Sequence, residues 1–104
     1  MKLKLGIADR LNLIGLLPTE KTTFEDLIIC EAITDKLQIT VKEIAEFEIK
    51  TVGNSTQWNE KGVKSELDVK LEEIEANLIK TLLKKKNESN EMSKNYFKLF
   101  KLFV

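Results

Sequence analysis

Thr40 to Asn54 reads TVKEIAEFEIKTVGN, and this stretch decides the fold class because its hydrophobic period changes halfway along. Thr40 and Glu43 match the capping box, in which a Thr hydroxyl and a Glu carboxylate each accept a backbone N–H bond. A short helix should follow and end near Glu46. Apolar and polar residues then alternate over 47–52, which is typical of a half-buried strand. The combination indicates an α+β protein.

Turn signals follow this strand. Gly53-Asn54 predicts a tight turn, after which Thr56–Asn59 could return antiparallel. Lys61-Gly62 predicts a second turn, and Val63–Val69 could form a third strand. We therefore expect a two- or three-stranded antiparallel meander. It must pack on helices, because a lone hairpin is marginally stable in water.

Helices are expected upstream of the meander. The segment Phe24–Leu37 has apolar residues over most of its circumference and Thr22 and Thr23 as candidate N-caps, so it predicts a central helix buried on more than one side. Asp9 could cap a shorter helix that ends before Pro18. Residues 1–5 alternate Lys and Leu after Met1 and could form an edge strand or a lead-in to this helix.

Two helices are expected downstream. The first runs from about Asp68 to Lys86, and its apolar residues recur at steps of three and four: Leu67, Leu71, Ile74, Leu78 and Leu82, with Ile79 and Leu83 beside them. The second runs from about Ser93 to the end. Its apolar face comprises Tyr96, Leu99, Phe100 and Phe103, opposite Lys94, Lys98 and Lys101.

The chain has 104 residues, which is the usual size of one domain. We expect a single compact α+β domain over 1–104, with about five helices packed on the small meander. Its helical part would span 7–46, the meander 47–69 and the C-terminal helices 70–104.

The composition excludes most catalytic chemistry. Histidine is absent, Cys30 is the one cysteine, and the four glycines are scattered rather than gathered in a phosphate-binding loop. Cys30 lies among apolar residues and is expected to be a buried, inert thiol. The sequence therefore predicts a protein that is not an enzyme and has no catalytic residue, no metal site and no cofactor.

The net charge of zero, from 17 basic and 17 acidic residues, argues against a protein built mainly to hold nucleic acid. The charge is uneven, however, since residues 76–104 contain seven Lys and two Glu. Lys84, Lys85 and Lys86 are the candidate anion contacts. The ordinary interpretation is that they neutralise the negative end of a helix.

Aromatic residues are the candidate partner contacts. Trp58 lies in a polar stretch and is either a lid on the core or an interface anchor. Tyr96, Phe97 and Phe100 belong to the basic, amphipathic last helix, which could dock on its own core, on a second copy or on a membrane. Own-core docking is the default interpretation, because exposing so many apolar residues would be costly.

No segment reaches the roughly 20 apolar residues of a membrane span, and no secretion signal is recognised at the start. We therefore expect a cytoplasmic protein.

Several features follow one another in a set order along the chain: Leu16-Leu17-Pro18, Phe24–Leu37, Leu37–Glu43, Trp58, the Glu-rich helix from Leu71, and Tyr96–Phe100. This order resembles a family of small uncharacterised proteins encoded by phages and prophages of Gram-positive bacteria. The resemblance spans nearly the whole chain, although the Phe-rich end departs from the family pattern. The resemblance implies a phage or prophage context, in the cytoplasm of the host cell, and no mechanism.

The leading hypothesis is a non-enzymatic protein–protein interaction module that binds through the hairpin around Trp58 or through the last helix. The first alternative is a nucleic-acid-associated accessory protein that uses the basic C-terminal end. The second alternative is a homo-oligomeric assembly subunit.

Overall fold

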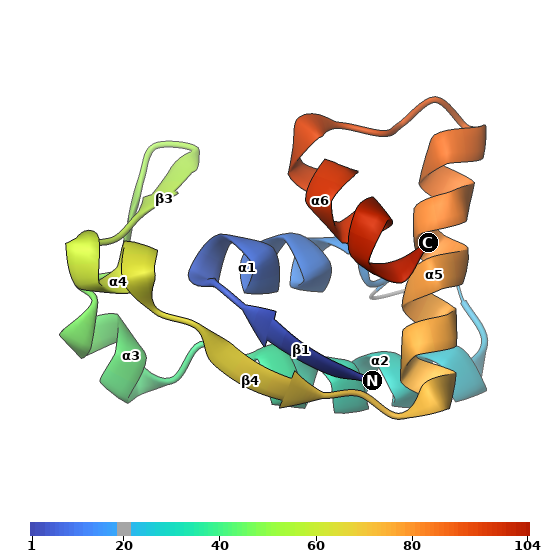
Figure 1. The fold of residues 1–104 in the computed structure, drawn as a ribbon, viewed down its shortest axis with the longest axis horizontal. Helices are drawn as coiled ribbons and strands as arrows, with labels where there is room; N and C mark the ends of the chain where they lie inside the picture. The colour runs from blue at the N-terminus through green and yellow to red at the C-terminus, as the bar shows by residue number, and fades with distance from the viewer. Residues whose placement is uncertain (19–21) are drawn as a thin grey trace.

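The protein has an α+β fold, as the sequence predicts (Figure 1). The computed structural model describes residues 1–18 and 22–104, and within them it has six helices and four short strands. The helices are α1 (Ile7–Leu16), α2 (Phe24–Leu37), α3 (Val41–Glu46), α4 (Glu60–Lys64), α5 (Glu73–Glu88) and α6 (Lys94–Phe103). The strands are β1 (Lys2–Leu5), β2 (Lys50–Val52), β3 (Ser55–Gln57) and β4 (Leu67–Lys70).

The strands form two separate antiparallel pairs, β1 with β4 and β2 with β3. The third strand expected in the meander is β4, which pairs with β1 instead of with the hairpin. Of the two alternatives for residues 1–5, the edge strand is the one that forms. The reason is burial, because the pairing turns the alternate residues Leu3, Leu5, Leu67 and Val69 toward the core.

The hairpin β2–β3 turns at Gly53, whose φ of +61° suits glycine, and it returns antiparallel as predicted. The expectation of a half-buried strand over 47–52 is wrong, since all six strand residues are exposed. Residues 47–49 instead terminate α3. The N–H of Ile49 donates to the carbonyl of Ile44, and Glu48 adopts the left-handed conformation of a helix C-terminus.

Helix α4 occupies the position where Lys61-Gly62 predicted a turn. The side chain of Asn59 caps this helix by accepting a hydrogen bond from the N–H of Gly62 at 2.9 Å. The region 47–69 therefore contains a helix, which separates β3 from β4. Sequence alone favoured a turn because Gly is a poor helix former, whereas this Gly is required for close packing, as described below.

The hydrophobic core is built from α1, α2, α5, α6 and the inner side of the β1–β4 pair. Helix α2 supplies Cys30, Ile33 and Leu37. Its prediction as a helix over Phe24–Leu37 with Thr23 as N-cap is confirmed, but the prediction that it is buried on several sides is wrong. Phe24 and Ile28 are 73% and 51% exposed, because the neighbouring elements cover one side of this helix.

Helix α5 begins at Glu73 and not near Asp68, because 67–70 form β4. The apolar residues of α5 that are buried are therefore Ile79 and Leu83. Ile74, in the first turn of the helix, is exposed. Glu75 is buried and accepts hydrogen bonds from the backbone N–H of Glu72 and from the ammonium group of Lys36. These bonds fix the start of α5 against α2.

Helix α6 packs on α5 and α1 of its own chain, as expected for a helix that docks on its own core. Leu99 and Phe103 are buried in the core. Lys98 donates to Asp9 at 2.9 Å, and Asp9 also accepts from the backbone N–H of Gly6. Gly6 is therefore the N-cap of α1, where the sequence suggested Asp9. Within the described residues, none of the helices combines the length and the apolar character needed to cross a bilayer.

The molecule divides into a body and a lobe. We define the lobe as residues 41–64, which comprise α3, the hairpin and α4, and the body as the remaining described residues. Figure 1 shows the lobe at the left, with the hairpin projecting from it. None of the buried core residues comes from the lobe, so the lobe is held in place by its junction with the body and not by a share of the core.

Arg10 of α1 makes this junction. Its side chain is buried and donates to the carbonyl oxygens of Leu37 and Gln38 at 3.0 and 2.7 Å. It also forms a two-pronged ion pair with the carboxylate of Glu43 at 2.6 and 3.0 Å. The same carboxylate accepts the N–H of Thr40 in the predicted capping box. One guanidinium therefore joins α1, the end of α2 and α3.

Protonation of Glu43 in acid should break the Arg10–Glu43 pair and destabilise the protein. The hydrogen bond from Arg10 is the main reason that the pKa of Glu43 is lowered from 4.5 to about 2. The pair's contribution to the free energy of unfolding is therefore fully present above pH 4.5 and disappears as the pH falls through 2. We expect a loss of about 2–3 kcal/mol across this interval, measured by urea denaturation at a series of pH values.

Glu43→Gln is the matched control for this prediction, because it keeps the shape of the side chain and removes the titrating group. It should lower stability at pH 7 and flatten the acid dependence relative to the parent protein. An equally steep acid transition in both proteins would contradict the assignment to Glu43.

Candidate functional site

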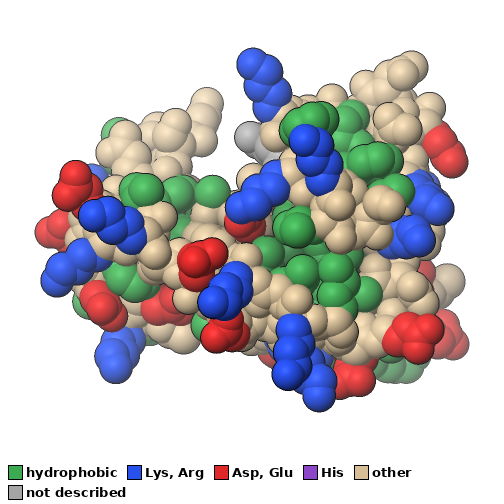
Figure 2. Space-filling view, viewed as in Figure 1, with side chains coloured by type: hydrophobic (Ala, Val, Ile, Leu, Met, Phe, Trp, Pro, Cys, Tyr) green, Lys and Arg blue, Asp and Glu red, His purple; other side chains and the backbone are tan. Residues whose placement is uncertain are grey.

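Several large apolar side chains of the lobe are exposed to solvent and do not belong to the core. Val41, Ile44, Val52 and Val63 are 83%, 44%, 50% and 70% exposed. No side chain of the lobe is buried; Gly62, which has none, is its one buried residue. In Figure 2 hydrophobic side chains are visible on the lobe, at the left, between charged ones of both signs. The lobe therefore exposes apolar surface that the core does not use, as parts of the body also do.

Helix α3 is oriented with its apolar face outward. Val41, Ile44 and Ala45 are related by steps of three and four and share one face of the helix, and all three are exposed. Glu43 lies away from this face and binds Arg10. An ordinary surface helix turns its apolar face to the core and its charges to water. In α3 this arrangement is reversed, since a charged residue makes the junction with the body.

Gly62 makes the second contact between lobe and body, where it packs between Trp58 and Ile7. A Cβ added to Gly62, in α4, would stand 2.8 Å from Trp58 Cδ1 and 3.1 Å from Ile7 Cδ1. Ile7 belongs to α1 and is buried. Trp58 is half-buried and packs beside Gly62 and not in the main core, and its role as an interface anchor stays a prediction.

The backbone at the base of the hairpin is strained. Glu48 has a φ of +51°, which is uncommon for a residue with a side chain. The side-chain amide of Asn59 donates to the carboxylate of Glu48 and to the carbonyl of Glu46, both at 3.2 Å. Asn59 therefore caps α4 and holds the end of α3 with one side chain, which orders the lobe without a hydrophobic core of its own.

The candidate contacts on α6 separate into two groups. Tyr96 and Phe100 are half-buried and pack against the core, so they serve the docking of α6. Phe97 is 58% exposed and lies under the ammonium group of Lys101, 4.4 Å from the ring centre. The structure thus leaves Phe97 as the member of this set that is mostly open to a partner.

The three candidate anion contacts are not equivalent. Lys84 and Lys85 are exposed at the end of α5. Lys86 pairs with Glu91 at 3.3 Å and lies 5.9 Å from the centre of the Tyr96 ring. Lys86 therefore stabilises the connection between α5 and α6. The three lysines do not form one common anion-binding site.

Metal binding and thiol chemistry can be assessed for the described residues. They hold no group of three or more side chains arranged to bind a metal ion. Cys30 is buried, and burial, with a smaller effect from Asp26, raises the pKa of its thiol. Such a thiol is held in its unreactive protonated form.

Sequence reasoning missed Arg10 and Gly62, the two residues that set the position of the lobe. An isolated Arg early in a helix looks like an ordinary surface residue, and its carbonyl partners are 27 and 28 residues away. A Gly within a polar stretch looks like a turn. The local signals that pointed to ordered elements here were the capping box at Thr40 and the Gly53-Asn54 turn.

No protein-family model, curated protein or solved structure matches this chain. The resemblance to small phage and prophage proteins therefore stays a prediction.

Gly62→Ala tests the Trp58 junction. The added methyl group would overlap Trp58, so we expect a loss of about 1–3 kcal/mol in the free energy of unfolding. Trp58 is the single tryptophan, and its displacement into water should shift the fluorescence emission to longer wavelength.

Gly15→Ala is the matched control. Gly15 lies in α1, and a Cβ added there would meet no neighbouring atom within 4 Å. Alanine at this position should stabilise the protein by about 0.5–1 kcal/mol and leave the emission of Trp58 unchanged. If the two substitutions behaved alike, the close packing of Gly62 would not govern the junction.

Proposed function

We propose that the protein is a non-enzymatic protein–protein interaction module that binds its partner through the exposed face of α3, formed by Val41, Ile44 and Ala45. The observation that carries the proposal is the reversed orientation of this helix. Its charged residue Glu43 forms an ion pair with Arg10 of the body, and its apolar face is exposed to solvent.

This orientation gives the isolated chain the Arg10–Glu43 ion pair but leaves the apolar face of α3 in water. Transfer of an aliphatic side chain out of water contributes about 1.5–3 kcal/mol, and part of this is not realised for Val41 and Ile44, which remain 83% and 44% exposed. A partner that covers them would recover that free energy on binding. The cap at Thr40 and the hydrogen bond that the Asn59 side chain donates to the carbonyl of Glu46 keep the face ordered beforehand, which reduces the entropy cost of binding.

The partner proposed here is another protein with an apolar surface of its own. The charged residues that flank the face, Lys42 and Glu46, have opposite signs and are exposed, so they would form a mixed polar rim around an apolar centre. The resemblance to phage and prophage proteins supplies the context, in which the partner is a host or phage protein.

Val41→Glu combined with Ile44→Lys tests the proposal. Both residues are exposed and the new charges suit their positions in the helix, so stability should change by less than about 0.5 kcal/mol. Partners are first identified by comparing proteins retained from host lysate by the parent and by the variant. Affinity for the purified partner, measured by calorimetry, should then fall at least about tenfold.

Ile74→Glu is the matched control, because Ile74 is an exposed aliphatic residue of α5, outside the lobe. It should leave the affinity unchanged. Equal losses for both proteins would place the contact elsewhere, and self-association of the parent abolished by the α3 substitutions in light scattering would make the partner a second copy.

A further inference from the structure

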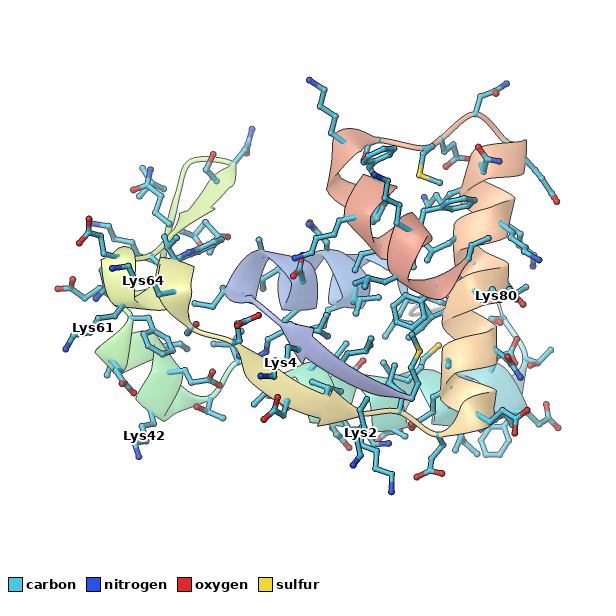
Figure 3. All side chains as sticks on the ribbon, in the orientation of Figure 1. Lys2, Lys4, Lys42, Lys61, Lys64 and Lys80 are labelled. Atoms are coloured by element: carbon cyan, nitrogen blue, oxygen red, sulfur yellow. The ribbon has the colours of Figure 1, made fainter. Side chains whose placement is uncertain are left out.

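The outer side of the β1–β4 pair carries an unusual arrangement of charge. The register places Lys2 opposite Lys70 and Lys4 opposite Asp68. Because residues alternate across a strand, these four side chains share the side facing away from the core, and all four are exposed. In Figure 3 the labelled Lys2 and Lys4 both lie along this pair of strands.

The Lys2–Lys70 pair is unfavourable for the protein itself. Side chains directly opposite on an antiparallel pair have Cβ atoms about 5 Å apart, and like charges at that separation destabilise the sheet. In the part of the chain that the structure describes, none of Lys2, Lys4 and Lys70 forms an ion pair with a carboxylate. Of the four charged residues on this side of the strands, the one acidic side chain, Asp68, lies opposite Lys4 and not opposite Lys2.

The same side of the strands forms an open hollow of about 490 Å³, lined by Lys2, Leu3, Lys4, Asp68, Val69 and Lys70. Lys2 and Lys70 lie at one end of it, and Lys4 and Asp68 lie one step of the alternation further along. Counting these charged groups gives three positive charges and one negative charge, a local excess of two. The hollow is large enough for a small ligand.

We propose that this hollow binds the phosphate groups of a nucleic-acid strand. A phosphate presents oxygens in several directions and can accept from Lys2 and Lys70 together, which removes their repulsion. Lys4 stands about 7 Å from Lys2 along β1, so it can reach a second phosphate of the same strand. This regular spacing favours a polymer of phosphates over a single carboxylate.

The site is separate from the α3 face and does not rest on the proposed function. It also differs from the C-terminal lysines that the sequence suggested, since Lys86 is already paired with Glu91. The small number of lysines is consistent with the net charge of zero. It implies weak binding that depends on salt.

Fluorescence anisotropy with a labelled single-stranded oligothymidylate tests the site. Three lysine contacts predict that the affinity falls about 20-fold when salt is raised from 50 to 200 mM. Absence of an anisotropy change at 50 mM salt would overturn the proposal. So would protection against thermal unfolding by inorganic phosphate without any binding of the oligonucleotide.

Lys70→Glu separates a binding role from a structural one, because its two expected effects have opposite signs. The new carboxylate faces Lys2, so the melting temperature should rise, whereas oligonucleotide affinity should fall at least about tenfold. Lys84→Glu, which changes an exposed lysine of α5, should leave affinity within about twofold. Loss of binding in Lys84→Glu but not in Lys70→Glu would overturn the proposal and assign the contact to the C-terminal end.

Discussion

The buried guanidinium of Arg10 holds together three segments that are distant in the sequence. Its donors satisfy the carbonyl groups of Leu37 and Gln38, where α2 ends, and its charge is matched by Glu43 of α3. A buried cation is tolerated only when it is paired and fully hydrogen-bonded, and no buried side-chain polar atom of the described residues lacks a partner. The direction in which the chain leaves α2 is therefore fixed by electrostatics and not by apolar packing.

This constraint explains why the molecule has a body and a lobe. The body contains the whole hydrophobic core and accounts for most of the apolar burial. The lobe is positioned by Arg10 and by the fit of Gly62 between Trp58 and Ile7, and its helices and hairpin are ordered by local caps. Because the lobe has no core to fill, its outer side chains are free of packing constraints, and that freedom allows α3 to present an apolar face.

Each of the two surfaces proposed for binding exposes side chains in a locally unfavourable arrangement. On α3 the apolar residues Val41 and Ile44 remain in water, and on the β1–β4 pair Lys2 faces Lys70. Each arrangement is locally unfavourable, although Glu43 on the inner side of α3 pairs with Arg10 and Asp68 lies opposite Lys4 beside the lysine pair. Sequences that fold well tend to agree at every level, and local conflicts concentrate at functional sites. The conflicts here involve different chemistries, apolar on the lobe and cationic on the strands, so they indicate two different kinds of partner.

Local sequence patterns are enough to predict the fold class, α2 from Phe24 to Leu37, the capping box at Thr40 and the amphipathic α6, because caps and helical periodicity involve residues that are close in the chain. The pairing of β4 with β1, the start of α5 and the exposure of α2 were decided by tertiary structure. Residues 67–70 fit either a strand or a helix, and only the distant partner β1 selects the strand. The α3 face and the Lys2–Lys70 pair likewise depend on contacts between distant parts of the chain. Arg10 orients α3, and the register of β1 with β4 brings the two lysines together, and no local sequence pattern encodes either contact.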